Sequence, residues 1–217
     1  STPTAASVSW TITGTNDAPT VSGAVTATVA EDAASSTLNA LANASDVDDL
    51  TTLSVVNVPG TLPAGVTYNA ADHTFTLDPS NAAYQHLGVG QSTVVTVNYA
   101  VTDGTVTTPT PASVSWTVTG TNDDPTVAGP LTIATTEGNA PVVRDLLAGA
   151  SDPDSGDSPS IDVSSIRYSV NGGSPTTTIP DGITFPDAHT INIDAAGLHH
   201  LPANATDTIV VSYNIVD

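Results

Sequence analysis

Apolar and polar residues alternate along several short stretches of this sequence. The clearest are STVVTVNYAV at residues 92–101 and ASVSWTVTG at residues 112–120, where nearly every second residue is apolar. A period of two places alternate side chains on opposite faces of a strand, so each stretch predicts a strand with one buried face. Together with the Gly, Pro and Asp residues between them, such stretches predict seven strands and one helical turn in the first half of the chain. The strands are expected near residues 20–30, 36–43, 52–58, 66–69, 73–77, 93–102 and 112–119, and the turn near 80–87. Short strands at this spacing are typical of an antiparallel β-sandwich.

The chain contains two copies of one pattern. TPTAASVSWTITGTNDAPTVSG at residues 2–23 aligns without a gap with TPTPASVSWTVTGTNDDPTVAG at residues 108–129. VVTVNYAVTD at residues 94–103 likewise parallels IVVSYNIVD at residues 209–217. The second copy also carries NGGSP at residues 171–175, which predicts an additional hairpin turn. Two copies of about 100 residues predict an array of like domains.

The ends of the two copies suggest how the domains are divided. We expect residues 1–16 to be the final strand and linker of a preceding or neighbouring domain, residues 17–122 to be the first repeat, and residues 123–217 to be a second repeat without its last strand. The strand at residues 5–14 is then expected to complete the domain of a neighbouring unit, on the same long polypeptide or on a separate molecule. The alternative is an arbitrary end with a frayed strand.

Charge and composition narrow the classes of partner and function. The chain has 22 Asp and Glu residues against two Lys and Arg residues, and its formal net charge is −20. Such a surface repels nucleic acid and anionic lipid, so we expect neither nucleic-acid binding nor membrane insertion. The sequence has no Cys, which excludes disulfides and thiolate metal sites. It also contains no Gly-x-Ser-x-Gly elbow and no phosphate-binding glycine loop, so we do not expect an enzyme.

The acidic residues are unevenly placed along the chain. Asp46 and Asp48 form an Asp-x-Asp pair, Asp152 and Asp154 form a second pair, and each pair accompanies an Asn-Asp linker. Clustered carboxylates without Lys or Arg favour a hard cation such as Ca²⁺, which takes six to eight oxygen ligands. The alternative is that the acidic side chains only cap turns. We prefer that alternative for the isolated residues, which are Asp72, Asp162, Asp181, Asp187 and Asp207.

Several motifs together carry a resemblance to a known family. TGTNDAPTV, AED at residues 30–32, ASDVDD at residues 44–49, LDPSNAAYQHLGVGQS and YAVTDG resemble, in this order, the VCBS repeat of large bacterial adhesins of the RTX type, and the related cadherin-like domains. The resemblance covers almost all of the first copy and the second copy more loosely. It implies an all-β fold of tandem immunoglobulin-like (cadherin-like) antiparallel β-sandwiches, arranged end to end with Ca²⁺ at the junctions.

The resemblance also implies which residues bind the Ca²⁺ ions. At the junction between the two repeats, the implied ligands are Glu31, Asp78, Asn122, Asp123, Asp152, Asp154 and Asp217, with Asp124 as a further candidate. At the junction with a preceding unit, they are Asn16, Asp17, Asp46, Asp48 and Asp103, joined by Glu137 and Asp194 of that unit. The second copy departs from the first where it has TEGN in place of AEDA and DPDSGD in place of DVDD. The last motif resembles part of an EF-hand loop but lacks the Glu at its twelfth position.

These features predict a secreted or cell-surface structural protein. We expect a calcium-stiffened rod or fibre, as in an adhesin extender or a biofilm filament, with like domains of the same protein or of neighbouring subunits as head-to-tail partners. The alternative function is an adhesive module that recognises surface carbohydrate or a host or matrix ligand.

Overall fold

The computed structural model describes residues 1–195 and 201–217 of the chain. The chain is divided into two compact units. The first comprises Ser1–Gln85 and Gly90–Gly120, and the second comprises His86–Val89 and Thr121–Asp217. The regular elements of the described residues are strands, which confirms the expected all-β class. Among these residues, none forms a helix with the length and hydrophobicity that crossing a membrane requires.

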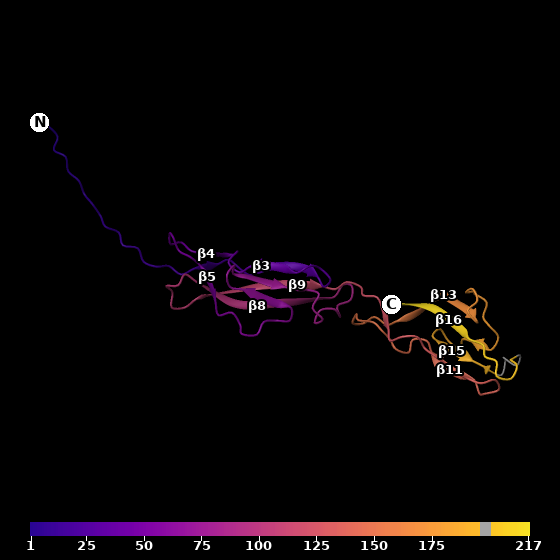
Figure 1. Ribbon diagram of the computed structural model, residues 1–217. Coiled ribbons are helices and arrows are strands. Elements are labelled where there is room, and N and C mark those ends of the chain that lie inside the picture. The colour runs from indigo at the N-terminus through magenta and orange to yellow at the C-terminus, as the bar shows by residue number, and fades with distance from the viewer. Residues whose placement is uncertain (196–200) are drawn as a thin grey trace. The chain divides into compact units, whose positions relative to one another are not determined.

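The first unit is a two-layer β-sandwich. Its strands are β1 (Thr20–Val21), β2 (Val25–Ala30), β3 (Ser36–Asn39), β4 (Ala44–Ser45), β5 (Ser54–Val56), β6 (Val66–Asn69), β7 (Thr74–Leu77), β8 (Ser92–Thr102) and β9 (Thr110–Thr119). One sheet has the order β2-β9-β8-β5, a second has the order β3-β7-β6, and β1 pairs with β4. Figure 1 shows β8 and β9 side by side, and their ten paired residues form the longest ladder of the unit.

Most of the strands expected in the first copy are present, with two differences. The strand expected at residues 20–30 is divided into β1 and β2 at Gly23, where φ is +151° and favours glycine. The region expected to hold a helical turn forms successive hydrogen-bonded turns, in which the Tyr84 N–H donates to the Asn81 carbonyl at 2.9 Å. The pairing of β2 with β9 is parallel, whereas the other ladders are antiparallel. The first and last strands of the repeat therefore lie next to each other.

The core of the first unit follows from the alternation seen in the sequence. Every second residue of β9 points inward, and Val114, Trp116 and Val118 are fully buried. The Tyr99 ring lies 5.3 Å from the Phe75 ring, and the Tyr99 hydroxyl donates to the Ala40 carbonyl at 2.6 Å. Burial raises the pKa of Tyr99 to about 12, because the apolar surroundings disfavour the phenolate.

The second unit repeats part of this plan. Its strands are β10 (Thr126–Val127), β11 (Val142–Asp145), β12 (Ala150–Ser151), β13 (Ser160–Val170), β14 (Ile183–Thr184), β15 (Thr190–Ile193) and β16 (Ile209–Val216). β10 pairs with β12, β13 pairs with β16, and β11, β15 and β14 form a three-stranded sheet. Leu146, Tyr168, Ile183 and Ile191 are its buried core. The Tyr213 hydroxyl donates to the Leu146 carbonyl at 2.7 Å, as Tyr99 does to Ala40 in the first unit.

The additional hairpin turn expected in the second copy is present. Asn171 and Gly172 both have positive φ values, of 51° and 75°, and the Gly173 N–H donates to the Val170 carbonyl at 2.9 Å. Two consecutive residues with positive φ are the signature of the tight hairpin turn that suits the twist of antiparallel strands. The turn returns the chain so that Thr176 bridges to Tyr168. This confirms the interpretation of NGGSP.

Candidate metal centre

The Asp-x-Asp loops have the same hydrogen bonds in both units. In the first unit the Asp48 N–H donates to Asp46 Oδ1 at 2.9 Å, and Asp48 Oδ2 accepts the linker N–H of Asp17 at 2.8 Å. In the second unit Asp154 takes the place of Asp48, and the corresponding distances are 2.9 Å to Asp152 and 2.9 Å to Asp123. The acidic turn that recurs 106 residues apart in the sequence therefore forms the same local structure twice.

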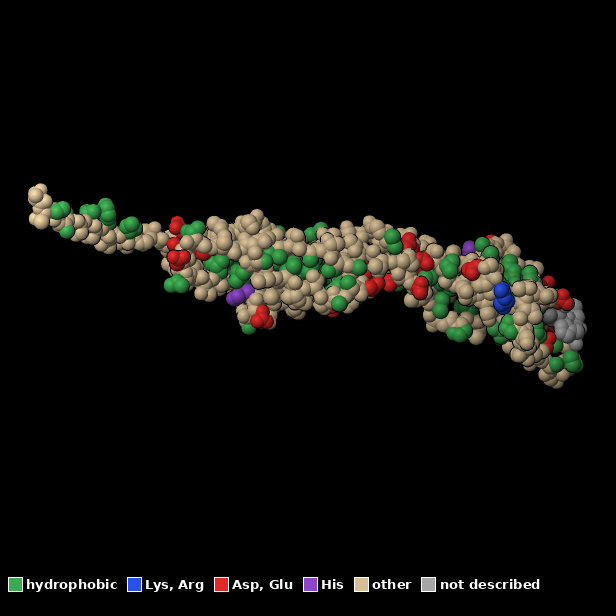
Figure 2. Space-filling model, turned by 90° about the horizontal axis from the view of Figure 1, so that it is seen from above, with side chains coloured by type: hydrophobic (Ala, Val, Ile, Leu, Met, Phe, Trp, Pro, Cys, Tyr) green, Lys and Arg blue, Asp and Glu red, His purple; other side chains and the backbone are tan. Residues whose placement is uncertain are grey.

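A short strand pair brings each linker to its loop. β1 pairs with β4 through Thr20 and Ser45, and β10 pairs with β12 through Thr126 and Ser151. The linker lies just before the first strand of each pair, and the Asp-x-Asp loop begins just after the second. Because the strands are antiparallel, these two segments meet at the same end of the pair. In Figure 2, acidic side chains gather where the N-terminal segment joins the first unit.

Some of these carboxylate oxygens are buried without a hydrogen-bond partner. Among the described residues, they include Oδ2 of Asp46, Oδ2 of Asp152 and Oδ1 of Asp154. The first two belong to the same position of the repeat, and Asp154 is only 3% exposed. A buried carboxylate oxygen without a donor loses its hydration and gains nothing in return, which is costly unless a cation supplies the interaction. These orphaned oxygens are the observation that fits a bound metal ion.

A third acidic side chain joins the pair in the second unit. One carboxylate oxygen each from Asp152, Asp154 and Asp157 can be chosen so that all three lie within 4.8 Å of one another. At that separation two negative charges repel by about 1–4 kcal/mol, depending on how far water screens them. A divalent cation among them turns this repulsion into attraction, and Ca²⁺ would complete its six to eight oxygen ligands with carbonyl groups and water. The three residues could therefore hold such an ion.

Asp157 was not among the residues that the sequence predicted. It lies in DPDSGD, the motif of the second copy that resembles the start of an EF-hand loop. The spacing of its third acidic residue was the signal that could have identified it. The first copy reads DVDD at this place, so a comparison of the two copies alone draws attention away from Asp157.

Asp103 closes the cluster in the first unit. Its Oδ2 accepts a hydrogen bond from Asn16 Nδ2 at 2.8 Å, and its Oδ1 accepts the backbone N–H groups of Thr105 and Val106. The hydrogen bonds from Val106, Asn16 and Thr105 hold the pKa of Asp103 below its ordinary value, because they stabilise the charged form. The first unit thus brings five predicted residues together at one end, namely Asn16, Asp17, Asp46, Asp48 and Asp103.

The corresponding end of the second unit is less completely connected. Asn122 Nδ2 donates to the Asp123 carbonyl at 3.3 Å, as Asn16 does to Asp17 at 2.9 Å. Asp217, the counterpart of Asp103, directly follows β16 and is exposed. Asp124 is exposed in the linker.

The remaining predicted ligands lie beside other strands. Glu31 directly follows β2, is buried, and donates its backbone N–H to the Thr119 carbonyl at 3.0 Å. Asp78 and Asp194 directly follow β7 and β15, and their N–H groups donate to the Gly65 and Gly182 carbonyls at 2.9 and 2.7 Å. Glu137 lies in an exposed turn. The joint coordination of one ion by ligands of successive domains stays a prediction.

Some acidic residues that are isolated in the sequence stabilise turns, which is the role that the sequence predicted for them. Asp162 accepts hydrogen bonds from the hydroxyl and the backbone N–H of Ser164, and Asp187 accepts hydrogen bonds from the backbone N–H groups of His189 and Thr190. These hydrogen bonds lower the pKa of both carboxyl groups. Such residues already use their oxygens locally, which distinguishes them from the orphaned ones.

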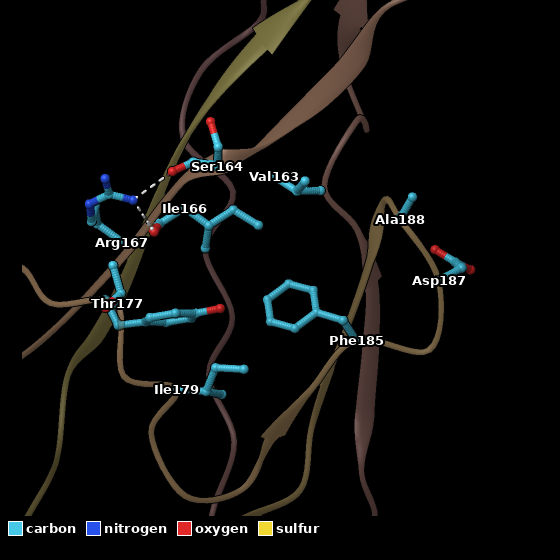
Figure 3. Close-up of a pocket in the computed structure, with 10 residues that line it drawn as sticks. Val163, Ser164, Ile166, Arg167, Thr177, Ile179, Phe185, Asp187 and Ala188 are labelled. Atoms are coloured by element: carbon cyan, nitrogen blue, oxygen red, sulfur yellow. Dashed lines mark hydrogen bonds between the residues drawn. The ribbon is translucent and has the colours of Figure 1, made fainter.

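One open pocket of about 360 Å³ lies in the second unit (Figure 3). The Phe185 ring points into the space beside Ile166 and Ile179. Arg167 also lines the pocket, but its Nη1 donates to the Ser164 and Ile166 carbonyls at 2.8 Å each. A small-ligand site needs polar groups that converge on the ligand. Since these contacts turn Arg167 Nη1 to its own strand, the pocket is a weaker candidate site than the acidic clusters.

Several solved structures and one family model are similar to this chain or to part of it. No curated protein matches this sequence. The solved structures that resemble it include the extracellular cadherin domains 1–5 of Protocadherin Gamma B2, with 15% identity over 92% of this chain and 38% of that one, and a TM-score of 0.45. They also include human Protocadherin-24 EC1-2, with 16% identity over 93% of this chain and 96% of that one, and a TM-score of 0.44.

A further solved structure, of Protocadherin Gamma B7 extracellular cadherin domains 1–4, has 14% identity and a TM-score of 0.43. That match covers 94% of this chain and 50% of the other chain. This chain therefore spans half or less of the length of the two Protocadherin Gamma structures. The family comparison concerns the first repeat. Residues 15–119, which hold the β1–β9 sandwich and its acidic cluster, match the family described as Cadherin-like domain.

Proposed function

We propose that this chain is an extracellular structural segment whose cadherin-like repeats bind Ca²⁺ and form part of a stiffened rod or fibre, such as an adhesin extender or a biofilm filament. The proposal rests on one observation above all, which is that the same buried carboxylate oxygen is left without a partner in both repeats, at Asp46 and Asp152. Bound Ca²⁺ would supply the missing interaction at each site. The role requires no catalysis and no nucleic-acid partner.

In this proposal the neighbours of each repeat are like domains, arranged head to tail. Residues 5–14 complete the sandwich of a neighbouring unit, on the same polypeptide or on a separate molecule. Glu31 and Asp78 of one domain would add to the cluster at the start of the next, and Glu137 and Asp194 would do so at the following junction. The source of the resemblance, the VCBS repeats of bacterial adhesins, suggests a secreted or cell-surface location.

The size of the calcium effect can be worked out in advance. Extracellular calcium modules bind with Kd values of about 10⁻⁴–10⁻³ M. At about 10 mM Ca²⁺ one such site stabilises the folded state by roughly 1.4–2.7 kcal/mol. For a domain of about 100 residues this corresponds to a rise in Tm of about 6–20 °C over the same protein in EGTA. Calorimetry in Ca²⁺ and in EGTA measures this difference for each unit.

Asp154→Asn tests the second unit, with Asp181→Asn as the matched control. Both substitutions remove one negative charge, but Asp154 is buried in the cluster whereas Asp181 is exposed. We expect Asp154→Asn to lose the calcium-dependent rise in Tm while leaving the Tm in EGTA unchanged or higher, because it removes a repelling charge. Asp181→Asn should keep the rise. If Asp154→Asn and the control respond equally to Ca²⁺, the cluster is not the binding site.

The rod itself is tested by small-angle scattering of the intact chain. Bound Ca²⁺ should narrow the distribution of lengths, and EGTA should broaden it. An unchanged distribution would refute calcium-stiffened junctions even if the ion binds. For the alternative role as an adhesive module, a glycan array is the direct measurement, and specific binding that Phe185→Ala abolishes would assign that role to the pocket.

A further inference from the structure

The N-terminal segment presents an apolar face that contacts no sheet of its own unit. Residues 1–18 form no strand and are exposed, and Val8, Trp10 and Ile12 are 73%, 80% and 92% exposed. Figure 2 shows hydrophobic side chains along this segment. These three residues alternate with polar ones, as in β9, where Val114, Trp116 and Val118 occupy the same positions and are fully buried. Residues 4–13, which we call the donor segment, therefore have the pattern of a strand without its sheet.

In the described part of the second unit, the edge of the sheet at the matching position is unpaired. In the first unit β9 lies between β8 and β2. In the second unit β16 corresponds to β8, and residues 131–136 correspond to β2. Within the described residues, β16 pairs with β13 alone, and residues 131–136 form no strand. We call β16 and residues 131–136 the acceptor edge.

Burial on the inner face of β16 shows what a strand added at this edge would cover. Val95, Val97 and Tyr99 of β8 are at most 6% exposed. Their counterparts in β16, at residues 209, 211 and 213, are only half-buried. An open strand edge beside partly exposed apolar side chains is a strong site for the addition of another strand.

We infer that the donor segment of one chain inserts at the acceptor edge of a second copy of this chain, so that copies join head to tail. The inference rests on the proposed array of like domains and names the neighbour that completes the sandwich. The donor segment and β9 are identical at eight of their ten positions, which differ only at Ala5 and Ile12. The donor segment of a second copy therefore brings to the acceptor edge nearly the same sequence that, as β9, completes the sandwich of the first unit.

The pairing in the first unit predicts the register between copies. Trp116 lies opposite Val95 on one side and Ala27 on the other. By the spacing of the repeat, Trp10 would lie opposite Ile209 of β16 in antiparallel pairing and opposite Ile133 in parallel pairing. Val8 would lie opposite residues 211 and 131 in the same way. The Leu131 side chain, now 40% exposed, would then be covered.

Charge also favours this contact between two strongly acidic copies. The formal net charge of the chain is −20, yet residues 1–15, residues 131–136 and β16 contain no charged side chain. The two surfaces can therefore approach without placing like charges directly opposite each other, which would oppose association. One contact is not reproduced, because Val142 stands at the position of Ser36, whose hydroxyl accepts the Trp116 Nε1–H at 3.1 Å. The association should accordingly be weaker than the closure of the first unit.

Sedimentation of the intact chain in Ca²⁺ at increasing concentration tests the inference. Val8→Asp places a charge on the inner face of the donor segment, and Ser9→Asp places the same charge on its outer face as the matched control. Both positions are exposed in the single chain, so neither substitution should affect its folding. We expect Val8→Asp to weaken association by on the order of 100-fold, because it buries a charge at the centre of the contact. Ser9→Asp should weaken it by less than about tenfold.

A peptide of residues 1–15 supplies the second measurement. It should occupy the acceptor edge, shorten the assemblies of the unaltered chain, and raise the Tm of the second unit in the Val8→Asp chain. A chain that remains monomeric up to about 0.1 mM, or equal association of the two variants, would overturn the inference. So would a monomer in which acrylamide cannot quench Trp10, since the segment would then close its own chain. The Val8→Asp monomer should retain the calcium-dependent rise in Tm, so a failure of this inference is distinguishable from a failure of the proposed calcium sites.

Discussion

Trp116 and Trp10 occupy the same position of the repeat in opposite surroundings. Both lie in the sequence SVSWT, yet Trp116 is fully buried whereas Trp10 is 80% exposed. Replacing a buried Trp with Ala removes its transfer free energy and leaves a cavity, at a cost of about 3–5 kcal/mol. The same substitution at an exposed position costs within about 0.5 kcal/mol. The two residues are therefore an internal control for each other.

The loss in the first unit should be large. Besides its packing, Trp116→Ala removes the hydrogen bond from Nε1 to Ser36 Oγ at 3.1 Å. For a unit of about 100 residues, each kcal/mol lowers Tm by about 4–8 °C, so the Tm of the first unit should fall by roughly 12–40 °C. Trp10→Ala should leave that Tm unchanged when the chain is dilute and monomeric.

Calorimetry and fluorescence together measure this difference. Calorimetry follows the transition of the first unit in each variant. Trp10→Ala leaves only Trp116, whose emission should be blue-shifted and poorly quenched by acrylamide, whereas Trp116→Ala leaves only Trp10, which should be readily quenched. A loss below about 1 kcal/mol in Trp116→Ala would refute the assignment of Trp116 to the core. An equal loss in both variants would show that the two strands are not in different surroundings.

Two further predictions concern the first unit. Gly65 has a φ of +71°, and an added Cβ would lie 2.6 Å from the Asp78 carbonyl oxygen, whereas Gly90 has a φ of +83° with open space around it. Gly90→Ala should therefore destabilise the unit by roughly 1 kcal/mol, and Gly65→Ala should destabilise it by more. Urea unfolding measures both losses, and equal values would contradict the close approach of Gly65 to the Asp78 carbonyl. Because the pKa of Tyr99 is raised to about 12 in the folded state, its contribution to stability is present below pH 10 and is lost as pH rises towards 12. Burial also raises the pKa of the other four tyrosines, so ultraviolet titration should place tyrosine ionisation above the ordinary range, and Tyr99→Phe should remove a step near pH 12.

Much of the fold could be predicted because it depends on local patterns. Period-two alternation determines which faces of β8 and β9 are buried, and the hairpin at Asn171 follows from turn chemistry. The parallel pairing of β2 with β9 could not be predicted in this way, since it joins residues 89 positions apart in the sequence, and neither segment specifies its partner. Residues 131–136 are a second case, because their sequence alternates as β2 does, yet they pair with no strand among the residues that the structure describes.

The candidate site was predictable to a different extent. Asp46 and Asp48 were predicted from their spacing and from its repetition in the second copy, whereas Asp103 was predicted only because the resemblance to cadherin-like domains implies it. The orphaned oxygens of Asp46, Asp152 and Asp154 could not be foreseen, because burial and hydrogen bonding depend on how the loops fold back on the linker. Asp157 was missed because the first copy has Thr51 at the equivalent position, in a loop of the same length between β4 and β5.

The close identity of the donor segment and β9 has a consequence for folding. While a chain is unfolded, either segment fits the groove beside β8, so an arm from another molecule competes with the chain's own β9. The chain's own strand prevails at low concentration, because the tether to β8 gives it a high effective concentration. In crowded refolding or strong overexpression that advantage shrinks, and entangled, domain-swapped assemblies become the characteristic error. Productive folding of such a protein therefore depends on each domain closing before its neighbours arrive.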